Sequence, residues 1–239
     1  MTFDLDKFIS NYSLVDILYL EEFWDLQYIA LKDSWTKLTK SRQMSNYDES
    51  LFISLVIINS LLSYQLSWKW EDRWKEFWEY VFSNFDKFDN ILEYKNFLAN
   101  SKNNRRLLNM KLKRFDKIIW FFENYKKIDD YIFFYDNMEL LNKELAKYLK
   151  QKLDAKTVVF AVKMFWYACR VVLEKTNTYP YSIKIPLDSR IKKIYELNNK
   201  WKYSDNEVLN YFDKLSQKYN IPPLHMDTLL WVKYWQTLN

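Results

Sequence analysis

DAKTVVFAVKMFWYACRVVLEKTNTYPYSIKIPLDSR, residues 154–190, is the stretch that decides the fold of this chain. Its pattern predicts a helix from Lys156 to about Lys175, an irregular segment that contains proline, and a second helix that begins after Asp188. Apolar residues surround the first helix on almost every side, which is typical of a buried helix. We therefore expect this helix to form the core of an all-α protein.

Two charged residues in this stretch allow two interpretations. Lys156 lies in the first helical turn, where the helix dipole gives a lysine no benefit. Asp188 precedes SRIKKIYEL and is a natural N-cap. In the simpler interpretation the lysine extends to solvent and the carboxylate only caps a helix. In the other, both side chains face one site. The residues alone favour the simpler interpretation and leave the other open.

The composition excludes several classes of protein. With 239 residues and 49% hydrophobic content, the chain can form one large domain or two small lobes. A net charge of +5 permits a polyanionic partner without requiring one. One cysteine and one histidine exclude a disulfide framework and a histidine-based metal site. The start resembles no signal peptide, and no apolar run reaches the roughly 18 residues that span a bilayer. We expect a soluble cytoplasmic protein.

Helical spacing accounts for most of the remaining chain. It predicts two or three helices within residues 1–45, one or two within 128–151, and a very apolar helix over 48–66 that Asp48 or Ser50 would cap. Ser204 and Glu207 form a predicted capping box for a helix over 204–219. Prolines open a last helix after residue 221. Strand signals are nearly absent, so the fold class is all-α.

Basic residues are concentrated in residues 101–119, SKNNRRLLNMKLKRFDKII. Apolar residues at helical spacing predict a helix with one buried side and one outward basic stripe. Such a stripe is either a solvated helix face or a surface that neutralises nucleic-acid phosphates. Its basic residues are Lys102, Arg105, Arg106, Lys111, Lys113, Arg114 and Lys117.

Three runs, KTVVFAVKMFWYACR (156–170), IPLDSR (185–190) and IPPLHMDTLLW (221–231), together resemble the archaeal GO glycosylases. These are N-glycosylase/DNA lyases of the helix-hairpin-helix superfamily that remove 8-oxoguanine. The resemblance implies one glycosylase unit over residues 1–239, folded as two helical lobes with the active cleft between them. It also implies that Lys156 attacks the sugar to form a Schiff base and that Asp188 assists, without a metal or other cofactor.

The same resemblance implies a pocket for a base that has been rotated out of the duplex. Polar groups would read the edge of the base, flat or apolar side chains would hold its faces, and basic residues would contact the DNA backbone. As ordinary structural residues, these would be a surface glutamine, core aromatics, a first-turn carboxylate and a solvated basic face. The polar readers are Gln27 and Asp227, the pocket walls are Trp74, Phe160 and Trp231, and the backbone contacts are Lys102, Arg105, Arg106 and Lys113.

The predicted function is therefore that of a bifunctional repair enzyme. It would act as a monomer on DNA that contains 8-oxoguanine, release the base, and cleave the strand by β-elimination. The alternatives are a non-catalytic helical DNA-binding module, which keeps the basic stripe without the chemistry, and a helical scaffold for protein partners.

The absence of glycine is unusual, since average usage of about 7% predicts roughly 17 in this length. Against the family pattern, Trp68, Trp70 and Trp166 stand at glycine positions, and the hairpin turn KLDAK has no glycine. One hypothesis is that the gene uses UGA for glycine, and the codons at these positions would decide it. In that case an indole at position 166 should pack poorly. The alternative is a natural glycine-free protein with a repacked core.

Overall fold

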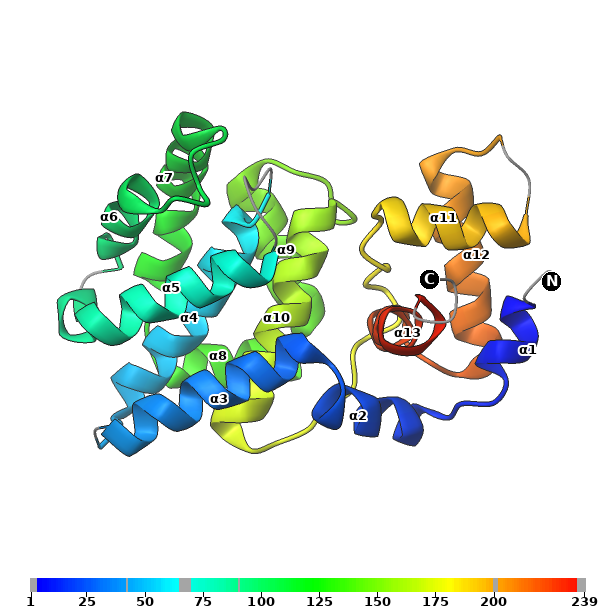
Figure 1. The fold of residues 1–239 in the computed structure, drawn as a ribbon, viewed down its shortest axis with the longest axis horizontal. Coiled ribbons are helices and arrows are strands. Elements are labelled where there is room, and N and C mark those ends of the chain that lie inside the picture. The colour runs from blue at the N-terminus through cyan, green and yellow to red at the C-terminus, as the bar shows by residue number, and fades with distance from the viewer. Residues whose placement is uncertain (1–3, 42, 65–69, 90, 200–201, 236–239) are drawn as a thin grey trace.

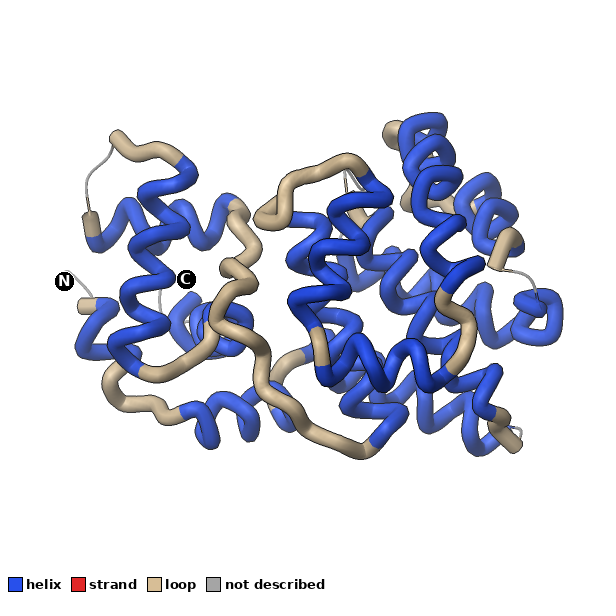
Figure 2. The backbone as a smooth tube through the Cα atoms, turned by 180° about the vertical axis from the view of Figure 1, so that it is seen from behind, coloured by secondary structure: helices blue, strands red, loops and turns tan. Residues whose placement is uncertain are grey.

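The computed structural model describes residues 4–41, 43–64, 70–89, 91–199 and 202–235. Helices dominate these ranges, and none of the residues in them forms a strand (Figure 2). The all-α prediction is therefore confirmed for the described chain. Trp68 lies outside these residues, as does the side chain of Trp70, so the structure bears only on the third of the tryptophans at glycine positions, Trp166.

The helices form two lobes, each around its own hydrophobic core (Figure 1). The larger lobe contains α3 (Leu26–Ser41), α4 (Asn46–Leu62), α5 (Trp70–Asn84), the 3-10 helix η1 (Phe85–Asp89), α6 (Glu93–Asn100), α7 (Leu108–Asn124), α8 (Ile128–Asp136), α9 (Met138–Leu149) and α10 (Lys156–Leu173). The smaller lobe contains α1 (Leu5–Ile9), α2 (Leu14–Phe23), α11 (Ser189–Asn198), α12 (Asp205–Tyr219), α13 (Pro223–Leu229) and the π-helical turn η2 (Leu230–Tyr234). The chain crosses between the lobes at residues 24–25 and along residues 174–188.

Two buried helices, α4 and α10, form the centre of the larger lobe. Most residues of each helix are buried, as their apolar sequences predict. The expected cap of α4 is wrong by a few residues: Ser45 is the N-cap, and Asp48 completes a capping box with it. The capping box at Ser204 and Glu207 is confirmed.

The basic segment departs from the expected single helix. Helix α7 begins at Leu108, and residues 101–107 form a turn that the Glu76 carboxylate holds by accepting hydrogen bonds from the backbone N–H of Lys102 (2.6 Å) and the hydroxyl of Ser101 (2.8 Å). This long-range anchor overrides the helical pattern of the segment. Lys111 is buried, so it does not belong to the outward stripe.

Four of the described residues, none of them glycine, adopt the left-handed conformation in which glycine is usually found. Lys150 ends α9 in the hairpin before α10, Glu174 ends α10, and Asn220 ends α12. Leu107 precedes α7. Asparagine tolerates this conformation well, whereas for leucine, lysine and glutamate it is higher in energy than the right-handed conformation. The chain thus forms the turns of a helical hairpin protein without glycine, at a cost in conformational energy.

Trp166 is accommodated in the interior of α10. Its side chain is fully buried, and its indole N–H donates to the backbone carbonyl of Asn177 at 2.8 Å. The ring also contacts Tyr179, with ring centroids 4.7 Å apart. The indole therefore has a place in the interior at position 166, and the choice between recoded glycine and a repacked core stays with the codons.

Candidate active site

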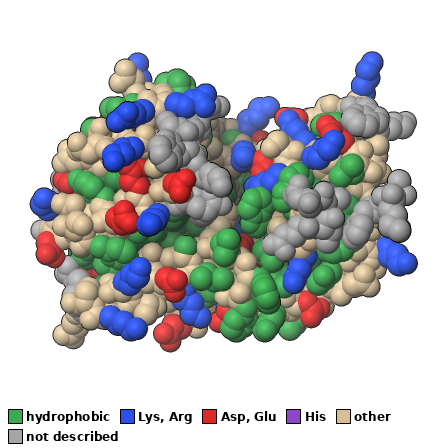
Figure 3. Space-filling view, in the orientation of Figure 1, with side chains coloured by type: hydrophobic (Ala, Val, Ile, Leu, Met, Phe, Trp, Pro, Cys, Tyr) green, Lys and Arg blue, Asp and Glu red, His purple; other side chains and the backbone are tan. Residues whose placement is uncertain are grey.

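A cavity of about 220 Å³ lies between the two lobes. On the face shown in Figure 3 the surface is hollowed between the lobes, with basic and acidic side chains beside the hollow. Both lobes contribute to the cavity, so its shape depends on how α10 faces α11 and α13. Its lining consists of Gln27, Ser63, Lys156, Phe160, Lys163, Pro186, Asp188, Arg190, Asp227 and Trp231.

Lys156 and Asp188 come together at this cavity. Lys156 opens α10 and Asp188 caps α11, and the amine nitrogen lies 3.8 Å from the carboxylate Oδ2. The lysine side chain is 55% exposed, whereas that of Asp188 is 9% exposed. The lysine amine is thus largely open to water. It points from the end of a helix toward the cavity with one weak ionic contact.

Asp188 is a carboxylate held from several sides. Its Oδ1 accepts the backbone N–H groups of Arg190 (2.9 Å) and Ile191 (3.0 Å), which are unpaired donors at the start of α11. Burial alone would raise its pKa, but the Arg190 charge, the Ile191 hydrogen bond and the Lys156 charge together hold the pKa of Asp188 below its usual range. The residue is therefore ionised at neutral pH and negatively charged beside the lysine.

Lys163 is a cavity residue whose role the sequence pattern did not reveal. Its side chain is 2% exposed, and its amine lies 2.7 Å from Asp227 and 3.8 Å from Asp25. Burial lowers the pKa of Lys163, but these carboxylates outweigh burial and raise it. The amine is a paired ammonium with no free electron pair for attack. A lysine within an apolar buried helix was the signal for such a pair, because buried charges require partners.

Of the residues expected to read the edge of the base or to hold its faces, four line the cavity and one does not. Gln27, Phe160, Asp227 and Trp231 all line it. The Gln27 Oε1 is buried and accepts no hydrogen bond from the described residues, so it is available to a ligand. Burial raises the pKa of Asp227, and the Lys163 charge opposes that rise. Trp74 instead lies in the core of the larger lobe, where its ring meets that of Phe77 edge-on.

The basic residues expected to contact DNA are on the surface. Lys102, Arg105 and Arg106 are exposed in the turn before α7, and Lys113 is exposed on α7 itself. Arg114 turns inward and donates to the Thr157 hydroxyl at 2.6 Å, next to the candidate nucleophile. The exposed charges thus come from a turn and a helix instead of one helix face.

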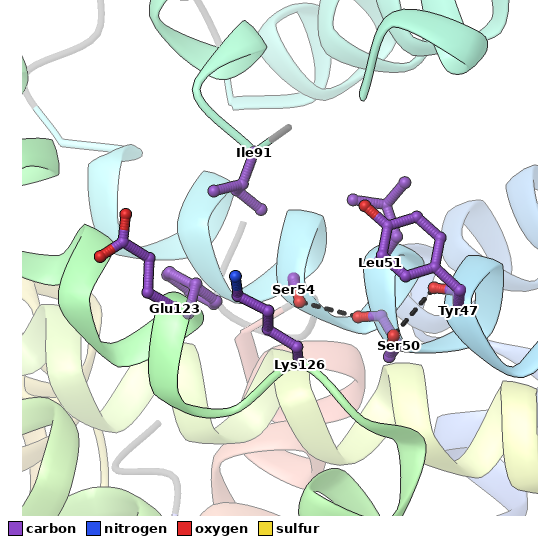
Figure 4. Close-up of a pocket in the computed structure, with 8 residues that line it drawn as sticks. Tyr47, Ser50, Leu51, Ser54, Ile91, Glu123 and Lys126 are labelled. Carbon is purple, nitrogen blue, oxygen red and sulfur yellow. Dashed lines mark hydrogen bonds between the residues drawn. The ribbon is translucent and has the colours of Figure 1, made fainter. Parts of the chain in front are cut away.

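A second cavity, of about 270 Å³, lies within the larger lobe (Figure 4). Its two serine hydroxyls donate to backbone carbonyls of α4, Ser50 to that of Tyr47 and Ser54 to that of Ser50, each within 2.8 Å. Glu123 and Lys126 lie at its other side as exposed side chains. Because its hydroxyl groups already have partners, this cavity offers less to a ligand than the one between the lobes.

The described residues contain no group of three or more histidine, cysteine, aspartate or glutamate side chains placed to hold a metal ion. Nor do they contain a helix long and apolar enough to cross a membrane.

Comparison with known proteins shows the family of the chain. It matches the AGOG family, described as N-glycosylase/DNA lyase, over residues 6–238. The chain belongs to this family. An N-glycosylase/DNA lyase of Methanococcus maripaludis is 43% identical over 213 residues, which cover 89% of this chain and 79% of the relative. Another from Nanoarchaeum equitans is 35% identical over 229 residues, covering 95% and 88%.

The fold agrees with a solved AGOG structure. The crystal structure of Pa-AGOG, the 8-oxoguanine DNA glycosylase from Pyrobaculum aerophilum, in complex with 8-oxoguanosine superposes with a TM-score of 0.75. The two chains are 24% identical, and the match covers 95% of this chain and 84% of the other. Its membership in the AGOG family and its N-glycosylase/DNA lyase relatives show that the chain is an enzyme, a DNA N-glycosylase with lyase activity. A non-catalytic binding module and a protein scaffold no longer describe it.

Proposed function

We propose that this enzyme excises 8-oxoguanine from DNA through a Schiff base on Lys156 and then cleaves the strand by β-elimination. The observation that carries the proposal is the meeting of Lys156 and Asp188, 3.8 Å apart, at a cavity also lined by Gln27, Asp227 and Trp231. A nucleophile, a carboxylate and a set of base-reading groups then share one site.

The chemistry assigned to each group follows from its surroundings. Neutral Lys156 attacks C1′ of the sugar as the bond from C1′ to the base breaks, and the base leaves with the bonding electrons and takes up a proton. Positive charge that develops on the sugar is stabilised by the Asp188 carboxylate. Opening of the sugar ring gives the Schiff base, and loss of a 2′ proton then expels the 3′ phosphate. Lys163 cannot take the nucleophile's part because it is paired with Asp227.

Selectivity for 8-oxoguanine follows from acceptors in the cavity. Oxidation converts N7 of guanine from an acceptor into an N–H donor. The Gln27 Oε1, which accepts no hydrogen bond from the described part of the chain, accepts from such a donor, whereas undamaged guanine would leave it unpaired. The Trp231 ring offers a flat apolar wall, and aromatic contacts of this type contribute about 1–3 kcal/mol per base. The exposed cations Lys102, Arg105, Arg106 and Lys113 would contact phosphates.

Borohydride trapping on an oligonucleotide with one 8-oxoguanine tests the proposal. Lys156→Gln should lose both base release and the covalent complex while it keeps DNA binding and thermal stability, because the side chain is largely exposed. Lys152→Gln is the matched control, an exposed lysine of the same hairpin, and should trap normally. Trapping that survives in Lys156→Gln but disappears in folded Lys163→Gln would show that the nucleophile is misassigned.

A further inference from the structure

Arg190, the second residue of α11, makes two contacts that involve both halves of the candidate site. Its Nε and Nη2 donate to the Asp188 Oδ2 at 3.0 and 2.6 Å. Its guanidinium carbon also lies 3.3 Å from the ring centroid of Trp231, which is a stacking distance. One flat cation thus pairs with the carboxylate that would assist catalysis and covers the tryptophan that would hold the base.

A base that stacks on this face of Trp231 would compete with the arginine for the same surface. A purine is as flat as a guanidinium and would stack at a similar distance from the indole. The face of Trp231 under Arg190 is therefore closed to a base while the arginine stays there. The arginine is also incompletely satisfied, since its buried Nη1 donates no hydrogen bond to the described residues. An unpaired buried donor raises the energy of this arrangement and makes it easier to displace.

We propose that Arg190 is a positioning residue that keeps the DNA-free site closed, and that the incoming base displaces it from Trp231. The inference rests on the proposed function. When the guanidinium leaves, Asp188 loses its ion pair with Arg190 but keeps the two backbone hydrogen bonds that cap α11 and the Lys156 amine 3.8 Å away, which is neutral when it attacks the sugar. An unpaired carboxylate stabilises charge on the sugar better than one already neutralised. Occupation of the base site therefore makes Asp188 available for the reaction.

Binding of free 8-oxoguanosine measures this competition without interference from the chemistry. The parent protein is the Lys156→Gln variant, titrated by calorimetry, and Arg190→Ala is added to it. Removal of a cation–π contact that the ligand must break should tighten nucleoside binding about three- to ten-fold. Lys192→Ala is the control, because Lys192 on the same helix pairs with Asp205 at 2.7 Å and is not part of the cavity lining. Its nucleoside affinity should not change.

A second measurement tests whether the base displaces Arg190 or whether Arg190 only supports the site. In the enzyme with Lys156 intact, Arg190→Ala should lower the ratio of the single-turnover excision rate for 8-oxoguanine to that for guanine. Without the arginine, Asp188 is available for the reaction whether or not a base is stacked on Trp231. If Arg190→Ala melts at the temperature of the assay, Arg190→Gln replaces it, with the same expected results. Gln keeps a polar group near Asp188 but carries no charge to stack on the indole.

The outcomes distinguish the two proposals. If Arg190→Ala leaves the nucleoside affinity of the parent protein unchanged or lowers it, the arginine supports Trp231 instead of covering it. That result would overturn this inference alone. No nucleoside binding by the parent protein, together with no borohydride trapping by the wild-type enzyme, would overturn the proposed function and the inference with it.

Discussion

Asp188 caps α11 and, in the proposed function, also stabilises charge on the sugar, and substitution can separate these two roles. Asp188→Asn keeps an oxygen that accepts the N–H groups of Arg190 and Ile191 but removes the charge. We expect single-turnover base release to slow by about a hundred-fold or more, with only a small fall in melting temperature. A large fall in melting temperature with an unchanged rate would instead support a purely structural role.

The pH dependence of the same pair of proteins gives an independent check. The pKa of Asp188 is lowered in the folded state, because the Arg190 charge, the Ile191 hydrogen bond and the Lys156 charge outweigh burial. Its ionised form therefore stabilises the fold at pH values above the unfolded pKa, and this contribution is lost as the pH falls through the folded pKa. The difference in melting temperature between wild type and Asp188→Asn should accordingly narrow in acid.

Residues that read the base and residues that bind the backbone should respond differently to truncation. Trp231→Ala and Gln27→Ala remove contacts in the cavity, so they should reduce binding of 8-oxoguanine DNA by more than they reduce binding of undamaged DNA. Arg105→Ala and Lys113→Ala remove exposed cations and should weaken both DNAs alike, with a shallower dependence of affinity on salt. Titrations at several salt concentrations measure both effects. Equal losses on the two DNAs for all four variants would contradict this division.

At the scale of single elements, the left-handed helix end at Glu174 is a place where glycine should help. Glu174 terminates α10 with φ of 52°, a conformation that is unfavourable for a residue with a Cβ atom. Glu174→Gly should stabilise the protein by about 1 kcal/mol, or roughly 2–4 °C in melting temperature. Asn220→Gly is the control, since asparagine already tolerates its φ of 54° and should gain little. A stabilisation of Asn220→Gly as large as that of Glu174→Gly would show that glycine acts through something other than left-handed strain.

The elements that sequence could predict are those fixed by local interactions. The cap at Asp188, the capping box at Ser204 and the left-handed end at Asn220 involve neighbours along the chain, and all three were predictable. The start of α7 was not, because the Glu76 carboxylate that holds residues 101–107 comes from another helix. The pair of Lys163 with Asp227 joins residues 64 positions apart, so only the lysine's apolar surroundings hinted at it. The assignment of Lys156 depended on resemblance, because an exposed first-turn lysine carries no local signal of function.

At the scale of the whole molecule, buried charges join the two lobes. Lys163 and Arg170 project from α10 of the larger lobe toward carboxylates at the end of α2 and on α13 of the smaller lobe. Arg170 lies 2.9 Å from Glu22 and 3.8 Å from Glu21, and Glu21 in turn lies 2.8 Å from His225. Buried ion pairs fix geometry more reliably than they add stability. This network therefore sets how the lobes face each other across the cavity.

Arg170→Met tests this role, because it keeps much of the side-chain volume but leaves Glu21 buried without its arginine. Loss of one partner of a buried pair costs about 3–5 kcal/mol, which corresponds to a fall of roughly 6–20 °C in melting temperature. Lys175→Met is the control: it breaks an exposed pair with Asp136 just beyond α10, and such pairs contribute at most about 1 kcal/mol.

The double variant Arg170→Met with Glu21→Gln should recover much of the stability lost in Arg170→Met, because no uncompensated carboxylate then remains at position 21. It should not recover full discrimination of 8-oxoguanine. The backbone N–H of Gln27 donates to Asp25 at 2.8 Å, so the glutamine that we propose reads the base is attached to the same turn that these charges hold against α10. Melting curves and excision rates on damaged and undamaged DNA measure the two properties separately. If stability and discrimination return together, the network contributes stability alone and does not align the lobes.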